Sequence, residues 1–177
     1  MTKLRLATVW LDGCSGCHMS FLDMDHRLLD LAPKLDLVYS PLVDYKDFPE
    51  EVDVTLVEGS VSSEDDLAKV RKIRKHSKIL VSLGDCAVTG NVPAMRNPFG
   101  PPAVLRRAYV DNADPNSPIP NQVVPALLPR VRPVHEVVAV DVFVPGCPPS
   151  ADTIFATLSD LLEGRRPELA GETRFGA

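Results

Sequence analysis

Four cysteines are the residues of this 177-residue chain whose type and placement could do chemistry. Cys14 and Cys17 lie close together in a turn rich in Gly and Ser, whereas Cys86 and Cys147 follow singly and far along the chain. Each cysteine comes shortly after an apolar run and sits in a turn marked by glycine. Four thiolates at one place can hold an iron–sulfur cluster, hold a structural zinc, or pair as disulfides.

The spacing of the cysteines favours a cluster over zinc. Structural zinc sites usually pair two C-x-x-C knuckles, and here only Cys14 and Cys17 have that spacing. Cys147 is followed by Pro148, and a Cys-Pro pair is a familiar ending of cluster-binding loops. Glycines near the cysteines should let the backbone approach a cluster and aim N–H groups at its sulfurs. They are Gly13, Gly16, Gly84 and Gly146.

Composition describes an ordinary globular protein. The apolar fraction is 45% and the charged fraction 24%, and the net charge of −5 gives no basic footprint for nucleic acid. No apolar stretch is long enough to span a bilayer, so we expect no direct membrane insertion. The N-terminal residues show neither a signal peptide nor a twin arginine. We therefore expect a cytoplasmic protein with reduced cysteines.

Strands and helices alternate along the chain. Apolar, strand-like runs cover residues 4–10, 35–39, 52–57, 78–83 and 137–144, and helical patterns cover 19–32, 63–76 and 150–163. This alternation predicts an α/β fold with an open parallel sheet and helices on both faces, and five strands suit the flavodoxin-like order. Because the cysteines follow predicted strands, their loops should meet at the carboxyl edge of the sheet.

Residues 93–133 are rich in proline and predict mostly irregular structure. This segment holds ten of the 17 prolines, with a short helix expected near 103–108 and a helical turn at 123–128. It is either a loose insertion or, as we expect, a segment that packs on a partner. The domain organisation predicted is one domain over 1–163 with this segment inside it, followed by a polar, loose tail over 164–177.

Other residues near the predicted edge carry weaker signals. Glu58 ends a strand on the cysteine side, where it should be buried, either with a function or as an acceptor of backbone N–H groups. His18 is expected to border the sulfur site, with a ligand or proton-relay role as the alternative. Trp10 and Met19 are expected in the core.

Four motifs, in this order, resemble the small subunit of [NiFe]-hydrogenases over about residues 4–163. They are Gly13-Cys14-Ser15-Gly16-Cys17, Glu58-Gly59-Ser60, Gly84-Asp85-Cys86-Ala87 and Pro145-Gly146-Cys147-Pro148-Pro149. The resemblance implies that the four cysteines hold one [4Fe–4S] cluster and that Glu58 lies near the cluster and a subunit interface. It also implies that the Ni-Fe centre lies in a separate large subunit, which leaves no catalytic residue in this chain.

Departures from the wider family narrow the resemblance. Further C-terminal cysteines are lacking, so one cluster is expected. In the related subunit of respiratory NADH:quinone oxidoreductase the first two cysteines are adjacent, whereas here Ser15 and Gly16 separate Cys14 from Cys17. The chain thus resembles the small subunit of the soluble, bidirectional NAD-reducing hydrogenase, with electrons passing to diaphorase subunits that carry further clusters, a flavin and NAD. The alternatives are a single-cluster subunit of an energy-converting, membrane-associated hydrogenase and a zinc-stabilised interaction module without redox function.

The turn after the first strand also bears on flavin binding. In a flavodoxin this turn holds the phosphate, but here residues 12–17 carry two of the four cysteines. A flavodoxin-style phosphate site is therefore not expected in this chain, and a flavin is expected on a partner subunit.

Overall fold

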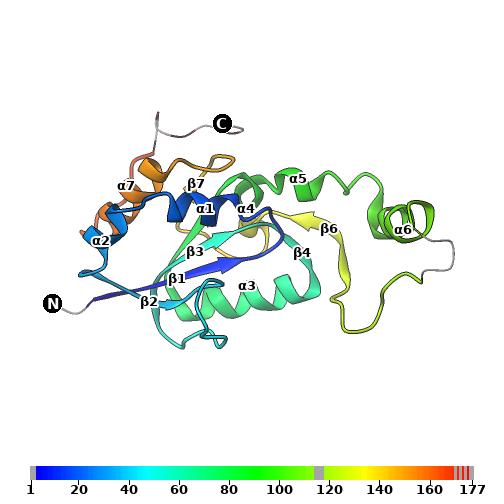
Figure 1. Cartoon of the computed structure of the whole chain (residues 1–177), viewed down its shortest axis with the longest axis horizontal. Helices are drawn as coiled ribbons and strands as arrows, with labels where there is room; N and C mark the ends of the chain where they lie inside the picture. Colours follow the sequence, from blue (N-terminus) through cyan, green and yellow to red (C-terminus); the bar gives the residue numbers. More distant parts are fainter. Residues whose placement is uncertain (1–2, 114–117, 170, 172, 174, 176–177) are drawn as a thin grey trace.

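A five-stranded parallel sheet forms the centre of the computed structural model, which describes residues 3–113, 118–169, 171, 173 and 175. The strand order is β2-β1-β3-β5-β7, the flavodoxin-like order predicted (Figure 1). The strands are β1 (Leu4–Trp10), β2 (Leu35–Tyr39), β3 (Val52–Glu58), β5 (Ser77–Leu83) and β7 (Val142–Val144). The predicted fold class is confirmed.

Helices cover both faces of the sheet, because the strands are apolar on both sides. One face packs against α1 (Gly16–Leu22), α2 (Arg27–Leu31) and α7 (Ala151–Leu162), with Phe21 and Leu158 among the buried residues. The other face packs against α3 (Glu64–His76) and the short α4 (Asp85–Thr89). Helix α3 begins, as predicted, with a capping box formed by Ser63 and Asp66.

The register of the sheet aligns the ends of four strands in one row. Trp10 at the end of β1 pairs with Glu58 at the end of β3, Glu58 pairs with Leu83 of β5, and Leu83 pairs with Val144 of β7. The segments that follow these strands therefore leave the sheet from the same level. This row is the structural reason why residues far apart in the sequence can meet at the carboxyl edge.

Two predicted elements are shorter than expected. The single helix predicted over 19–32 is two helices, α1 and α2, with a turn at Asp25, whose φ of 50° is left-handed and interrupts the helix. The strand predicted over 137–144 pairs only over Val142–Val144, and a 3₁₀ turn, η2 (Val134–Glu136), precedes it. The backbone before β7 is irregular, but it packs Val137, Val138 and Val140 against the core. Their apolar run therefore indicates burial and not a strand.

The proline-rich segment is more ordered than predicted. It contains α5 (Asn91–Ala94), α6 (Gly100–Arg106) and a π-helical turn, η1 (Arg107–Asp111). Prolines in the first turn of α6 fit the fixed φ of the ring, so they start this helix and do not break it. The helical turn predicted at 123–128 is wrong, because β6 (Leu127–Arg132) begins there and pairs antiparallel with β4 (Val61–Ser63).

Residues 91–113 and 118–126 form an arm beside the sheet. Figure 1 shows α6 and η1 beyond the end of the sheet, joined to it through α5 and β6. We call residues 91–126 the arm; its residues 114–117 lie outside the described part. No helix among the described residues is long and apolar enough to cross a bilayer.

Candidate metal centre

The four cysteines lie in loops and helix starts just beyond the row of strand ends. Cys14 precedes α1 and Cys17 lies in its first turn, Cys86 lies in the first turn of α4, and Cys147 lies between β7 and α7. All four are free thiols; Cys17 is buried, Cys86 is half-buried, and the other two are exposed. The loops that carry the cysteines thus leave the sheet at the same edge, as the fold class predicted, and Cys14 and Cys147 are the two cysteines exposed there.

The four cysteines are close enough for their charges to change the pKa values of Cys17 and Cys86. Burial raises the pKa of Cys17, and the neighbouring Glu58 and the three other cysteines raise it further. Burial likewise raises the pKa of Cys86, to about 11, with contributions from Cys14 and Cys147. A hydrogen bond from the backbone N–H of Val92 to Cys86 lowers this pKa in part. Without a bound cation Cys17 and Cys86 therefore stay protonated at neutral pH, so binding of a metal by these two residues must release protons.

Gly84 provides the space in which the sulfur of Cys17 lies. A Cβ built on Gly84 would fall 2.2 Å from Cys17 Sγ, a separation that no side chain can have. Its φ of +83° also lies in the region that favours glycine. Glycine at position 84 therefore lets the backbone lie close to the sulfur of Cys17.

The other three glycines predicted for the site differ in their surroundings. The N–H of Gly16 donates to Cys14 Sγ at 3.4 Å, as expected for a residue that serves the sulfurs. Gly13 instead faces Gly59, and Gly146 packs against Pro149. These two shape the turns, and the nearest atoms to a Cβ at either position are not sulfurs.

Asp85 joins the segments that carry Cys86 and Cys147. Its backbone N–H donates to Gly146 O at 2.9 Å, and its Oδ1 accepts the Gly146 N–H at 2.7 Å. On the other side, Ser20 Oγ donates to Pro149 O at 2.5 Å and ties α1 to the same loop. Sequence reasoning quoted Asp85 only as part of the motif around Cys86 and gave it no role, and it did not single out Ser20.

Glu58 and His18 form a buried pair beside Cys17. Glu58 is 2% exposed, and its Oε2 accepts the backbone N–H of His18 at 2.9 Å and contacts His18 Nδ1. The predicted burial of Glu58 and its role as an acceptor of a backbone N–H are both observed. His18 borders the site with its ring turned to Glu58, and its Nε2 is buried with no hydrogen-bond partner among the described residues.

Trp10 and Met19 are not in the core. Their exposed fractions are 45% and 56%, so the expectation of burial is wrong for the chain by itself. Both lie on elements next to the cysteines, β1 and α1, and their apolar surface is open at this edge. Periodicity places them on apolar faces but cannot tell an internal core from a surface that a partner covers.

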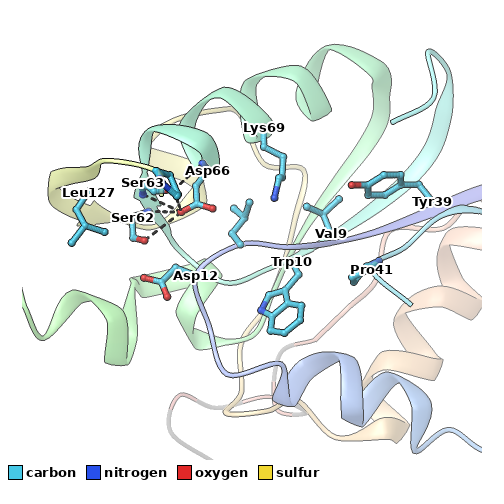
Figure 2. A pocket seen from close by; sticks show the side chains of 12 residues that line it. Val9, Trp10, Asp12, Tyr39, Pro41, Ser62, Ser63, Asp66, Lys69 and Leu127 are labelled. Carbon is cyan, nitrogen blue, oxygen red and sulfur yellow. Dashed lines mark hydrogen bonds between the residues drawn. The ribbon is translucent and has the colours of Figure 1, made fainter. Parts of the chain in front are cut away.

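A cavity of about 510 Å³ lies beside the cysteine edge, between the ends of β1 and β2 and the start of α3. Figure 2 shows its lining, with Trp10, Tyr39 and Lys69 around it. At its polar end, Asp66 Oδ2 accepts the backbone N–H and the hydroxyl of both Ser62 and Ser63, and Ser63 Oγ accepts the N–H of Asp66. The N–H groups of Ser62, Ser63 and Asp66 thus donate to side chains of the chain itself.

The donor set fits a multi-iron group better than a single ion. Four cysteine sulfurs are soft ligands of the kind that iron–sulfur clusters and zinc both accept. Within the part of the chain that the structure describes, however, no three His, Cys, Asp or Glu side chains converge closely enough to hold one metal ion. The four cysteines are nevertheless near enough for their charges to raise the pKa values of Cys17 and Cys86, an arrangement that suits a larger group held between them.

Comparison with known proteins gives the class to which this site belongs. The family model described as "NADH ubiquinone oxidoreductase, 20 Kd subunit" matches residues 14–161, a span that contains all four cysteines. The chain is 46% identical over 168 residues to the NAD-reducing hydrogenase HoxS subunit delta of Cupriavidus necator, covering 92% of this chain and 80% of that one. The chain therefore belongs to the family of the 20-kDa subunit, a family of oxidoreductase subunits.

Within this class, the chain is the small subunit of a [NiFe]-hydrogenase, as the motifs indicated. A crystal structure of an NAD⁺-reducing [NiFe]-hydrogenase in its H2-reduced state contains a chain that superposes with a TM-score of 0.94 at 42% identity, covering 98% of this chain and 99% of that one. A subunit of the F420-non-reducing hydrogenase of Methanocaldococcus jannaschii is 37% identical over 94% of this chain, which spans only 58% of that relative.

Proposed function

We propose that this chain is the electron-transfer subunit of a cytoplasmic NAD-reducing [NiFe]-hydrogenase. In this proposal Cys14, Cys17, Cys86 and Cys147 bind one [4Fe–4S] cluster, which supplies one-electron transfer between the Ni-Fe centre of a large subunit and a diaphorase module with further clusters, flavin and NAD. The observation that carries it is the row of strand ends that brings four free thiols to one edge. The chain itself performs no hydrogen chemistry.

The residues around the sulfurs have distinct roles in this proposal. The cysteines bind iron as thiolates, and the N–H groups of Gly16 and Val92 stabilise the negative charge on Cys14 and Cys86. Asp85 and Ser20 hold the ligand-bearing segments at fixed separation. Burial of Cys17 keeps water from one side, which also sets the potential.

The relatives differ in the electron acceptor that their names give, so the acceptor is the least uniformly supported part of this proposal. The Cupriavidus relative is named as NAD-reducing, whereas the Methanocaldococcus jannaschii relative is named as F420-non-reducing, a Methanosarcina barkeri relative as a coenzyme F420 hydrogenase subunit and a Pyrococcus furiosus relative as part of a sulfhydrogenase. The identity of 46% favours NAD. The energy-converting, membrane-associated alternative predicts hydrogen-dependent activity that sediments with membranes and does not reduce NAD.

Analysis of metal in the purified chain tests the cluster. We expect anaerobically purified protein to contain about four irons and four sulfides, with broad visible absorption and little zinc. Cys86→Ala and Cys147→Ala should each lose this absorption and weaken binding to the large subunit, whereas Ser159→Ala on α7 should keep both. One zinc without iron would establish the interaction-module alternative, and a full cluster in either cysteine variant would refute the ligand assignment.

A further inference from the structure

Asn91 is placed to contact the sulfur site through its side chain. It is the first residue of α5, directly after Gly90, and its Nδ2 lies 3.5 Å from Cys147 Sγ. Sulfur is larger than oxygen and its hydrogen bonds are correspondingly long, so this distance suits an N–H donor facing a thiolate. The amide oxygen in the same place would face a negative sulfur, and the chemistry therefore selects Nδ2 as the contacting atom.

The backbone around Asn91 aims the side chain at this sulfur. Gly90 and Asn91 have φ values of +86° and +32°, which turn the chain sharply between α4 and α5. Asn is one of the few side chains that adopt such a conformation readily. The turn is held by Thr89, whose Oγ1 accepts the Asn91 N–H at 3.3 Å and donates to Asp85 O at 2.8 Å.

Asn91 differs in kind from the other donors to the cysteines. Cys14 and Cys86 receive backbone N–H groups, from Gly16 and Val92, which every sequence with this backbone would provide. Cys147 receives a side-chain amide, so this donor depends on residue type. A hydrogen bond to a ligand sulfur stabilises the more negative, reduced cluster more than the oxidised one, and so raises the reduction potential.

We propose that Asn91 is a positioning residue that donates a hydrogen bond to Cys147 and raises the potential of the cluster. The inference rests on the proposed function, because it requires a cluster on Cys147. Asn91 is the first residue of the arm. The arm would thus take part in electron transfer, because one of its side chains adjusts the reduction potential of the cluster.

A redox titration of the full chain with its cluster, followed by EPR, tests this role. Asn91→Gly removes the donor and suits the positive φ, so the backbone turn should be kept. We expect an unchanged iron content and a shift of the potential to a more negative value. Asn112→Gly, an exposed asparagine at the far end of η1, is the matched control and should titrate as the unchanged protein does.

A second measurement does not depend on a variant. The unchanged protein, labelled with nitrogen-15 in its asparagine side-chain amides, should show coupling of one such nitrogen to the reduced cluster by pulsed EPR. Absence of this coupling, or an Asn91→Gly potential equal to that of the control, would overturn the inference. Unchanged protein that holds no cluster at all would instead overturn the proposed function, so the two failures are distinguishable.

Discussion

Gly84 is the residue at which side-chain size decides whether the sulfur site can exist. Any Cβ at this position would overlap Cys17 Sγ, and the positive φ adds a backbone cost for other residues. Sulfur cannot move away freely, because Cys17 is buried within the packed start of α1. A single methyl group at Gly84 should therefore disturb the ligand geometry and not only the backbone.

We expect Gly84→Ala to lose all or most of its iron and to lower the free energy of unfolding by about 1–3 kcal/mol. Gly164→Ala is the matched control, since Gly164 has a φ of +68° and no atom within 4 Å of a built Cβ. It should have the backbone cost of about 1 kcal/mol and keep its iron. Iron analysis and urea unfolding measure the two effects, and full iron in Gly84→Ala would contradict the close approach.

At the scale of the elements, Asp141 joins the edge strand β7 to the rest of the fold. Its Oδ2 accepts the N–H of Leu80 at 2.7 Å and Arg74 Nη1 at 2.6 Å, which links β5, α3 and the start of β7. The strand itself has only three paired residues, so these bonds supplement a short ladder. Because Cys147 follows β7 closely, the placement of this sulfur depends on how that edge is held.

This link should make stability dependent on pH. Burial alone would raise the pKa of Asp141, but the bonds from Arg74 and the Leu80 N–H outweigh it and lower the pKa below its ordinary value. The folded state therefore binds the proton more weakly than the unfolded state. The stabilisation is complete above the unfolded pKa of about 4 and is lost as pH falls through the folded pKa.

We expect Asp141→Asn to lower the free energy of unfolding by about 1 kcal/mol at neutral pH, a modest effect because the side chain is half exposed. The difference from the unchanged protein should shrink as pH falls below about 4. Asp30→Asn, at an exposed position on α2, should show no such difference. Urea unfolding across this pH range measures it, and a difference that stays constant down to low pH would refute the linkage.

At the scale of the whole molecule, the apolar surface near the cysteines and on the arm is left uncovered. Met95 and Phe99, which follow α5, are each 69% exposed, and Trp10 and Met19 are exposed at the cysteine edge. Large apolar side chains that stay exposed are common on surfaces that a partner covers. We therefore propose, as the proline-rich sequence first suggested, that the arm packs on the large subunit or a neighbouring module.

Phe99→Ser should weaken assembly with the large subunit roughly tenfold or more, while the melting temperature of the isolated chain stays the same. Phe175→Ser changes a similarly exposed phenylalanine outside the arm and is the control. Limited proteolysis gives an independent measure, since the arm should be cut more slowly in the complex than in the isolated chain. Equal cutting in both states, with normal assembly of Phe99→Ser, would count against the arm as an interface.

The sequence by itself predicted the α/β class, with five strands that suit the flavodoxin-like order, the position of α3 and the edge at which the cysteines meet. These follow from local signals: apolar runs, the capping serine before Glu64, and the placement of each cysteine shortly after a strand. The ligand roles of the four cysteines, and the division into a domain over 1–163 and a tail over 164–177, stay predictions. Part of that tail, residues 170, 172, 174, 176 and 177, lies outside the described residues.

Tertiary structure alone decided which side chains serve the sulfurs. Asp85 contacts Gly146, and Asn91 contacts Cys147, across separations of 61 and 56 residues. Such contacts depend on the register of β5 against β7, which no local pattern reports. The same reason explains the short β7 and the exposed Trp10: an apolar residue in a sequence indicates burial, but only packing shows whether a strand, an irregular segment or another subunit buries it.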